Sequence, residues 1–501
     1  MYAIGVDSGT QSTKVLIVDM TGSVLGRGSA PHNMVPGLKP GESEQDPKTW
    51  LNAFENALVM ALEDSGISPE NITSLGISGQ QHGCVPLDEE GNVIRPAKLW
   101  NDTSTVQETE ELVSRLGGDA ACIDKLGIGL AVGYTASKIL WLKKHEPENF
   151  SKLKTILLPH NFLNYILTGK RHMEYGDASG TGLMEIRSRE WNKDVLTAID
   201  SDLSDKLPVL SHPKKPAGLM TFDFARRYGM KEVLVSAGGG DNMMGAIGTG
   251  NTRPGVCTLS LGTSGTVYSY FDSPFVDPDG EIAAFCDSTG GWLPLLCTMN
   301  VTNTTEQLKS LLSISTEEME VLASQAPAGS DGLMFLPFLM GERVPVLPES
   351  NGVLFGMNSN NITRSHMVRA FMEGTVFNLG YGFNRMKDLG LTPTEIRATG
   401  GGANSSVWLQ MVADIFQTPV VSLKEQEAAA LGAAIQSIWC YHREWGNEQA
   451  IQDLTDEMVE IEGPPIKPRI ENIAKYERLQ DRFNSLWNTL RVEFKHHRKS
   501  D

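Results

Sequence analysis

The chain has 501 residues, which is too long for one hydrophobic core and predicts two or three domains. Its net charge of −18 would repel phosphate backbones, so we expect no nucleic-acid partner. No uncharged apolar run of about 18 residues appears, and the first residues, MYAIGVDSGT, lack the basic and apolar segments of a signal peptide, so we expect no membrane partner and a cytoplasmic location.

The N-terminal segment alternates apolar and polar residues. It predicts three strands, YAIGV, KVLIVD and SVLGRG, joined by the turns DSGTQST and MTGS. An amphipathic helix follows, because Asp46 can cap it, Pro47 suits its first turn and Gly66 can end it. Its apolar residues recur every four positions, at Trp50, Phe54, Leu58 and Leu62. The buried strand SLGISG comes next, so the chain begins as an α/β protein.

The second half of the chain restarts this pattern. The segment CTLSLGTSGTVYSY reads strand, Gly-Thr turn, strand, like YAIGVDSGTQSTKVLIV at the N-terminus. The turn residues of the second segment take the places of those of the first, with Gly262, Thr263 and Ser264 corresponding to Gly9, Thr10 and Gln11. This repeat predicts a duplicated architecture. Since GAIGTGNTRPG is glycine-rich and contains a proline, we expect the joint there, with domains over residues 1–246 and 247–501.

The rest of the second half continues the α/β pattern. EIRATGGGANSSVWLQMVADIF predicts a strand, a glycine turn and a helix, PVVSL a strand, and EAAALGAAIQSIWCY a helix. Residues 474–494 predict an amphipathic helix packed on the body of the protein. Its apolar side chains follow steps of three and four, at Tyr476, Leu479, Phe483, Leu486 and Leu490.

Two glycine-containing turns are candidate phosphate sites. In DSGTQSTK, the backbone N–H groups of a turn of small residues point outward, and such nests bind anions. The hydroxyls of Thr10, Ser12 and Thr13 and the charge of Lys14 would assist, and Asp7 would hold a magnesium ion through water. Alone, a hairpin of this kind is more often a structural turn than a phosphate site, and it is not a Walker P-loop. The second turn, LGTSGT, favours phosphate binding, because two such turns facing each other would clamp a triphosphate.

Two further glycine turns carry polar side chains. TGGGAN, at residues 399–404, begins a helix and would let a flat base approach the backbone closely, with Asn404 placed to bond to it. AGGGDN lacks the GxGxxG spacing of a dinucleotide site. It places one carboxylate, Asp241, directly after Gly238, Gly239 and Gly240, where the backbone can turn sharply and another molecule can come close.

Neutral polar side chains follow the predicted strand SLGISG, in the segment GISGQQHG. Gln80, Gln81 and His82 suit sugar hydroxyls, and a histidine packed in a core turn is the equal alternative. Trp100 and Asp102, in LWND, supply an indole and a carboxylate, which commonly meet the apolar face and the hydroxyl edge of a sugar. The six cysteines form no CxxC pair or zinc-like spacing, so we expect reduced, mostly buried thiols and no tight metal site.

These motifs together carry a resemblance. IGVDSGTQSTK, SGQQHG, GYTASKILWLKKH, GGGDN, SLGTSGT and TGGGAN follow one another in the order found in the FGGY carbohydrate kinases, over about residues 1–450. SGQQHG with GGGDN most resembles the xylulose kinases of that family, although the sequence FGGY itself does not occur. The resemblance implies two actin-like ATPase domains, each with a ribonuclease-H-like α/β core. ATP and sugar would bind in the cleft between them.

The resemblance also implies residue roles. It implies that Asp241 accepts the proton of the sugar hydroxyl and that Asn242, Gln81 and His82 bind the sugar. Most bacterial relatives have methionine where this chain has Gln81. Asp7 matches the aspartate on the phosphate side, as a catalytic residue that would also hold Mg²⁺ through water. Together with the turns above, the expected ATP contacts are Gly9, Thr10, Thr13, Lys14, Gly262, Thr263 (near the γ-phosphate), Gly401, Gly402 and Asn404.

The residues and the resemblance together predict a sugar kinase that uses ATP and Mg²⁺ to convert D-xylulose to D-xylulose 5-phosphate, in domains that close to exclude water. Family kinases of ribulose, glycerol or gluconate are alternatives, and gluconate is disfavoured because the sugar loop has no arginine. An actin-like ATPase and a sugar-binding regulator without catalysis are alternatives of other classes. Sugar and ATP are the expected partners, and a homodimer stays open.

Overall fold

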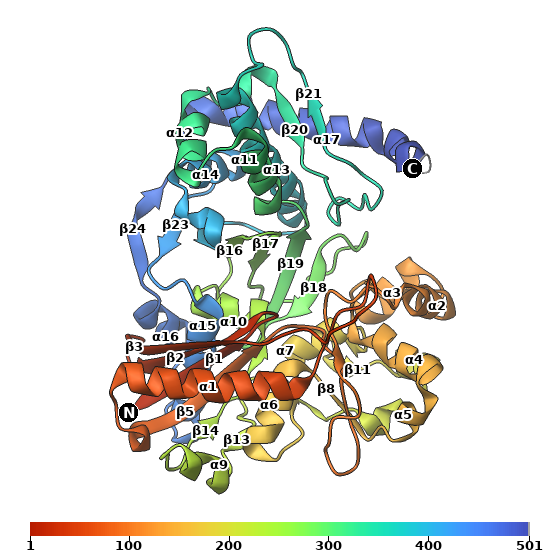
Figure 1. Cartoon of the computed structure of the whole chain (residues 1–501), viewed down its shortest axis with the longest axis vertical. Coiled ribbons are helices and arrows are strands. Elements are labelled where there is room, and N and C mark those ends of the chain that lie inside the picture. Colours follow the sequence, from red (N-terminus) through yellow and green to blue (C-terminus); the bar gives the residue numbers. More distant parts are fainter. Residues whose placement is uncertain (499–501) are drawn as a thin grey trace.

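The computed structural model describes residues 1–498, which form two α/β domains, one above the other in Figure 1. Each domain is built on a seven-stranded sheet. The first sheet has the order β13 (Gly218–Leu219), β14 (Leu234–Val235), β5 (Ile72–Gly79), β1 (Tyr2–Ser8), β2 (Ser12–Asp19) and β3 (Val24–Pro31), with β15 (Gly239–Gly240) also paired to β5. The second has the order β18 (Ala283–Cys286), β19 (Trp292–Thr298), β17 (Gly265–Ser269), β16 (Val256–Leu261), β22 (Glu395–Thr399), β23 (Val420–Leu423) and β24 (Ile461–Ile466).

The two sheets repeat one topology. The strands β3, β2, β1, β5 and β14 correspond in order and direction to β19, β17, β16, β22 and β23. In each series the first three strands are antiparallel neighbours, and the last three are parallel neighbours. A Gly-Thr turn joins β1 to β2 and another joins β16 to β17. The predicted duplication of the architecture is therefore confirmed.

Helices and short strand pairs complete the two domains. Up to the second sheet the helices are α1 (Pro47–Ser65), α2 (Val106–Leu116), α3 (Asp119–Leu126), α4 (Thr135–His145), α5 (Pro147–Ser151), α6 (Pro159–Thr168), α7 (Tyr175–Ala178), α8 (Lys193–Ile199), α9 (Phe222–Arg227) and α10 (Asp241–Gly248). The later helices are α11 (Thr302–Leu312), α12 (Thr316–Gln325), α13 (Arg364–Asp388), α14 (Ser406–Phe416), α15 (Ala428–Glu444), α16 (Ile451–Met458) and α17 (Ile470–Arg498). The 3₁₀ helices are η1 (Pro69–Asn71), η2 (Ser179–Thr181), η3 (Leu203–Lys206), η4 (Ser330–Gly332) and η5 (Gly401–Asn404). The strand pairs are β4 (Glu44–Gln45) with β7 (Ala97–Lys98), β6 (Val85–Leu87) with β8 (Thr155–Leu157), β9 (Met173–Glu174) with β12 (Leu210–Ser211), β10 (Met184–Glu185) with β11 (Glu190–Trp191), and β20 (Met334–Leu336) with β21 (Val353–Phe355).

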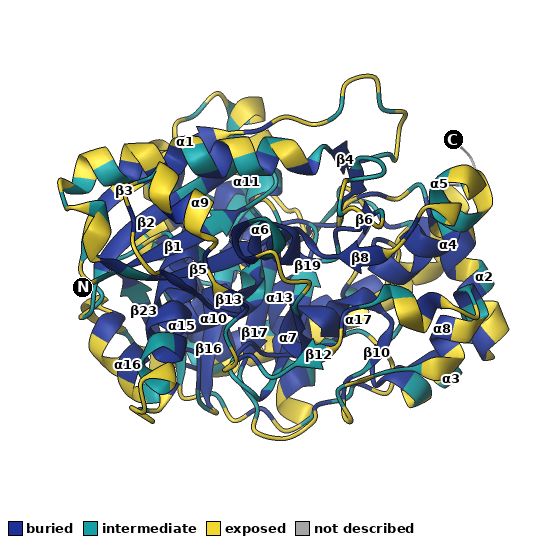
Figure 2. Ribbon diagram, turned by 90° about the horizontal axis from the view of Figure 1, so that it is seen from below, coloured by how far each residue is buried: buried dark blue, intermediate teal, exposed yellow. Residues whose placement is uncertain are grey.

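The helix α1 forms as its sequence predicts. The Asp46 carboxylate accepts a hydrogen bond from the Lys48 amide, and Gly66 ends the helix in the left-handed region with φ of 62°. Trp50 and Phe54 are fully buried against the first sheet. Figure 2 shows the exposed outer face of α1 above the buried strands. The predicted helix over residues 474–494 is also confirmed as the central part of α17.

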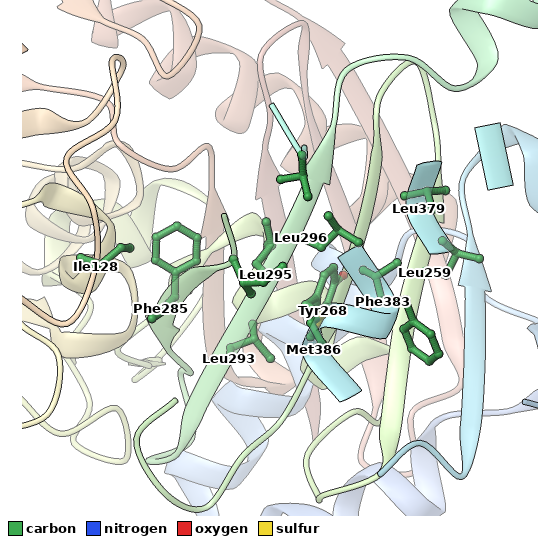
Figure 3. Close-up of a cluster of buried hydrophobic side chains, with 14 of the residues drawn as sticks. Ile128, Leu259, Tyr268, Phe285, Leu293, Leu295, Leu296, Leu379, Phe383 and Met386 are labelled. Atoms are coloured by element: carbon green, nitrogen blue, oxygen red, sulfur yellow. The ribbon is translucent and has the colours of Figure 1, made fainter. Parts of the chain in front are cut away.

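A second layer of packing lies between α13 and the second sheet. Figure 3 shows Leu379, Phe383 and Met386 of α13 facing side chains of the sheet, among them Leu296 and Tyr268. All of these side chains are buried. The helix thereby supports β17, which leaves the Gly262–Ser264 turn, and its neighbour β19, so apolar packing helps to hold that turn in place.

The two domains meet where α10 and α15 cross (Figure 1). A methyl group at Gly432 of α15 would overlap the carbonyl oxygen of Met244 in α10, and one at Gly248 would overlap the carbonyl oxygen of Ala428. On the opposite side, a methyl group at Gly5 of β1 would overlap the Ala430 carbonyl oxygen. The absence of side chains at these positions lets α15 lie directly on both α10 and the first sheet.

The remaining global expectations concern the thiols and the membrane. All six cysteines are free thiols, five of them buried and Cys297 partly exposed, which confirms that most of the thiols are buried. Among residues 1–498, no helix combines the length and the apolar character needed to cross a membrane.

The α10–α15 crossing generates a stability prediction. Gly432→Ala places a methyl group against backbone, which cannot move aside as a flexible side chain does, so unfolding becomes easier by about 1–3 kcal/mol or more. Thermal or urea unfolding measures this change. Gly129→Ala is the control, since its methyl group would meet only Ile123 Cγ1 at 4.0 Å. Equal stability of Gly432→Ala and wild type would show that the helices do not pack this closely.

Candidate active site

Three parallel strands of the first sheet end side by side and place the predicted sugar and catalytic residues together. In the register, Asp7 of β1 lies opposite Ser78 of β5, and Gly240 of β15 lies opposite Gly79 of β5. The carboxyl ends of parallel strands are the usual ligand-binding edge of an α/β sheet. Asp7, the loop from Gln80 to His82, and Asp241 therefore all emerge at one edge.

Two carboxylates at this edge influence each other. Ser78 Oγ donates a hydrogen bond of 2.8 Å to Asp7 Oδ1, while burial raises the pKa of Asp7. Burial also raises the pKa of Asp241 to about 7, and the negative charges of Asp7 and Asp177 add to that shift. A carboxylate with a pKa near neutrality is a stronger proton acceptor than an ordinary one and is typical of functional sites.

The glycines before Asp241 are required by its surroundings. Gly238 has φ of 72°, in the left-handed region that side chains rarely adopt. A Cβ atom at Gly240 would lie 2.6 Å from Gln81 Cγ and 2.9 Å from Asp177 Oδ1. The turn therefore brings the backbone close to two polar side chains, and Asp241 follows as the first residue of α10.

A chain of amide hydrogen bonds holds Asp241. Asn242 donates from its backbone N–H (2.8 Å) and from Nδ2 (3.0 Å) to Asp241 Oδ1. The same Nδ2 donates to Gln81 Oε1 at 2.9 Å. Gln81 Nε2 is buried without a hydrogen-bond partner in the described structure, as is Asp177 Oδ1. Gln81 thus orients Asn242 and, through it, the catalytic candidate.

His82 lies in a slot formed by both domains. Its ring centroid is 4.7 Å from that of Tyr134 in the first domain and 5.7 Å from that of Phe285 on β18 of the second. Burial lowers the pKa of His82 to about 3, and the charge of Lys138 contributes to that shift. The imidazole is therefore neutral at physiological pH and can both donate and accept a hydrogen bond.

Each Gly-Thr turn is closed by a hydrogen bond from its glycine amide, which reaches three residues ahead in the first turn and two residues ahead in the second. The Gly9 amide donates to Ser12 O and the Gly262 amide donates to Ser264 O, each at 3.1 Å. Thr263 is exposed at the tip of the second turn. Tyr268 lies farther along β17, and a Cβ atom at Gly245 of α10 would lie 2.8 Å from its hydroxyl. The strand that leaves the second turn therefore runs beside α10, the helix that begins with Asp241.

The first turn also contacts its neighbours through side chains. Trp100, which is 37% exposed, donates from Nε1 to Thr10 Oγ1 at 3.0 Å. Lys14 Nζ lies 2.6 Å from Glu427 Oε2, just before α15. Trp100 is therefore at the expected edge, next to the first phosphate candidate, and Lys14 is already paired with a carboxylate of the second domain.

The third glycine turn lies against the second. Gly400 has φ of 82°, and a Cβ atom at Gly402 would lie 2.8 Å from Leu261 Cβ, directly before Gly262. Gly401 and Asn404 are exposed, and a Cβ atom at Gly401 would have no neighbour within 4 Å. The candidate phosphate turn at Gly262 and the candidate adenosine turn at Gly401 are thus adjacent at the edge of the second sheet.

The side chains of Asp102 and Thr13, two of the predicted site residues, are engaged inside the protein. Asp102 is fully buried, and its carboxylate accepts from the Ser43 amide (2.9 Å) and lies 3.1 Å from Lys98 Nζ. Thr13 is also buried, and its hydroxyl donates to Ser8 Oγ at 3.3 Å. In this structure the Asp102 side chain supports the loop and the Thr13 side chain supports the turn from within.

Sequence reasoning missed two residues at this edge. Asp177 is fully buried, accepts a hydrogen bond from His160 Nδ1 at 2.9 Å and adds negative charge behind Gly240. Arg343 is exposed, and its Nη1 lies 3.9 Å from Cys297 Sγ. Its positive charge contributes to the lowered pKa of His82. The same charge opposes the larger effect of burial, which raises the pKa of Tyr134. The carboxylate of Glu342 anchors the Arg343 loop to β19 through the Met299 amide at 2.7 Å. Neither residue lies in a motif that marks its role.

Nearly the whole chain is similar to known carbohydrate kinases. Residues 2–248 match the N-terminal domain and residues 257–440 the C-terminal domain of the FGGY family of carbohydrate kinases. The chain belongs to this family. It is 43% identical to a xylulose kinase from Haemophilus influenzae, over 96% of this chain and 98% of that one, and 37% identical to a xylulose kinase from Streptomyces coelicolor, over 87% of each. The solved xyloylose kinase from Brucella ovis superposes with a TM-score of 0.91 at 26% identity, over 98% of this chain and 100% of that one.

Asp7 is the residue of this carbohydrate kinase whose free carboxylate oxygen fits a hydrated magnesium ion. Among residues 1–498, no group of three or more His, Cys, Asp or Glu side chains forms a metal-binding cluster. Of the Asp7 oxygens, Oδ1 accepts the Ser78 bond, which leaves Oδ2 for a metal-bound water. Magnesium keeps several waters and commonly uses one carboxylate together with substrate phosphates.

The coupling between Asp241 and its neighbours generates a titration prediction. In the ligand-free protein, the ¹³C resonance of the Asp241 carboxyl should titrate near pH 7, well above the ordinary 3.8. Asp177→Asn keeps a hydrogen bond to His160 but removes a negative charge, so the midpoint of Asp241 should move to lower pH. Asp194→Asn is the control, because the Asp194 side chain is exposed and paired with Lys125, and it should leave the midpoint of Asp241 unchanged. A wild-type midpoint near 4 would contradict this electrostatic account.

Proposed function

We propose that this carbohydrate kinase transfers the γ-phosphoryl group of ATP to D-xylulose and produces D-xylulose 5-phosphate. The observation that carries the proposal is the environment of Asp241. Its pKa is raised to about 7, and hydrogen bonds through Asn242 to Gln81 fix its carboxylate as a proton acceptor beside the candidate sugar-binding loop. The choice of xylulose is supported by the xylulose kinases to which the chain is 43% and 37% identical. In this proposal residues 1–246 supply the sugar site and the base, and residues 247–501 supply the nucleotide site.

The proposed reaction begins with binding of the sugar against Gln81, His82 and Asn242. His82 is neutral and Gln81 has an unpartnered Nε2, so both can bond to hydroxyl groups without introducing charge. Trp100 would lie along the sugar from the side of the first turn. Asp241 then removes the proton of the terminal hydroxyl as that oxygen attacks the γ-phosphorus, and the bond between this phosphorus and the β–γ bridging oxygen breaks.

Charge neutralisation in this reaction would come from both domains. The Gly9 and Gly262 amides are bonded within their turns, so the hydroxyls of Thr10 and Thr263 and the amides that follow the two glycines would hold phosphate oxygens. Lys14 and Arg343 would add positive charge. Magnesium, bound to the phosphates and to Asp7 through water, would neutralise the triphosphate. The exposed turn at Gly401 and Asn404 would receive the adenosine.

Arg343 also supports one competing substrate. Its charge acts on His82, and a cation at a sugar site can bind the carboxylate of a sugar acid. A coupled assay of ADP release against D-xylulose, D-ribulose, glycerol and gluconate separates these functions. The proposal requires the highest kcat/KM with D-xylulose. A clear preference for gluconate would overturn it, and sugar-independent ADP release alone would favour an actin-like ATPase.

The proposed base generates a prediction for catalysis. Asp241→Asn keeps the shape of the side chain but cannot accept a proton, so kcat should fall at least about 100-fold while ATP still binds. Steady-state kinetics and calorimetric ATP binding measure the two effects. Asp7→Asn is the comparison: part of its defect should respond to raised magnesium, whereas that of Asp241→Asn should not. Near-normal turnover by a folded Asp241→Asn protein would remove this residue from the mechanism.

The proposed adenosine turn generates a prediction for binding. Since a Cβ atom at Gly401 meets no protein atom within 4 Å, Gly401→Val should fold normally and fill space that the base would occupy. Calorimetry should show that ATP binding is lost while D-xylulose still binds. Ser406→Val, an exposed substitution on the following helix, is the control. Normal ATP affinity of Gly401→Val would place the adenosine elsewhere.

A further inference from the structure

One buried lysine has no place in the reaction described above. Lys138, in the segment GYTASKILWLKKH, lies on α4 and is 1% exposed. None of the ion pairs in residues 1–498 includes it. Burial lowers its pKa to about 7. The charge of Asp102 opposes this shift, but no carboxylate pairs with Lys138 directly. Burying an ammonium group without a direct ion pair is unfavourable, so a lysine here calls for a specific contact that compensates it.

The contacts of Lys138 lead to the sugar site. Its Nζ donates to the carbonyl oxygen of His82 at 2.7 Å and to that of Gly133 at 2.6 Å. Thr135 Oγ1 donates to the same His82 oxygen at 3.1 Å. Gly133 directly precedes Tyr134, whose ring packs on His82. One ammonium group therefore ties the sugar loop to the segment that forms the other wall of the His82 slot.

The backbone at His82 needs such a tie. Its φ is 62°, in the left-handed region that is unfavourable for a residue with a side chain. Rotation toward the ordinary extended region would turn the His82 carbonyl and move the ring away from Tyr134 and Phe285. The two donors on that carbonyl, Lys138 and Thr135, oppose this rotation.

We propose that Lys138 is a positioning residue of the sugar site, which holds the His82 backbone so that the imidazole is presented to a substrate hydroxyl. This inference rests on the proposed function, in which His82 contacts the sugar. Lys138 itself touches neither the sugar nor the phosphates. Its loss should therefore act on sugar affinity, through His82, and leave the ATP site intact.

Steady-state kinetics of Lys138→Met test this role. The KM for D-xylulose should rise at least about fivefold, as expected for loss of one well-placed hydrogen bond to the substrate, while the KM for ATP changes by less than about twofold. Lys143→Met is the matched control, because Lys143 lies on the same helix and donates to the Ile199 carbonyl at 2.8 Å, away from the sugar loop. It should leave both constants near wild type. Equal KM values for sugar in Lys138→Met and wild type would overturn the inference.

A double-mutant cycle with His82→Ala distinguishes positioning from a general structural role. Once the imidazole is gone, adding Lys138→Met should raise the sugar KM by less than about twofold, since no ring remains to be positioned. Independent effects that multiply would overturn the inference. If His82→Ala alone leaves the sugar KM unchanged, the proposed sugar contact fails; if it raises KM and Lys138→Met does not, only the positioning role fails.

A milder variant keeps the test valid if Lys138→Met does not fold. Thr135→Val removes only the second donor to the His82 carbonyl and keeps the shape of the side chain. It should raise the sugar KM by a smaller factor than Lys138→Met, with an unchanged KM for ATP. The cycle with His82→Ala applies to it in the same way. An effect of Thr135→Val that persists undiminished without the imidazole would overturn the inference.

Discussion

The structure depends on the contact of α15 with α10 and the first sheet, where glycines replace side chains. Gly432 lies against the backbone of Met244, and Gly5 lies against the backbone of Ala430. This contact joins the domains at the point where α10 begins with Asp241 and where the segment before α15 carries Glu427, the partner of Lys14. A close packing of backbones is stiff, because it has no side chains that can adopt other rotamers. The proposed catalytic carboxylate and the first candidate phosphate turn are thus oriented by the same junction.

The electrostatic problem of the site is that anionic substrates must bind to a protein with a net charge of −18. The described edge carries Asp7, Asp177 and Asp241, and the burial of Asp241 near the other two raises its pKa to about 7. The turns offset this negative charge with backbone N–H groups. The same carboxylates that disfavour a bare triphosphate favour one that arrives with magnesium. Repulsion among the carboxylates also makes Asp241 a better proton acceptor.

Much of this could be predicted from the sequence where the determinants are local. The helix α1 has its cap at Asp46 and its stop at Gly66 within one segment, and the two Gly-Thr turns are visible as a repeat. The environment of Asp102 was not predictable, because Lys98 and the distant Ser43 amide occupy it only after folding. Arg343 and Lys138 were missed as site residues for the same reason: their significance lies in contacts with Cys297 and His82, which no spacing in the chain reveals.

The position of one sugar hydroxyl group decides whether Asp241 can act as the base. A crystal structure of the protein with D-xylulose, Mg²⁺ and a non-hydrolysable ATP analogue would locate it. The account predicts that the terminal hydroxyl of the sugar lies within hydrogen-bonding distance, about 2.6–3.2 Å, of the Asp241 carboxylate and faces the γ-phosphate. A sugar whose terminal hydroxyl faces another acceptor, with Asp241 turned away from the phosphate, would contradict it.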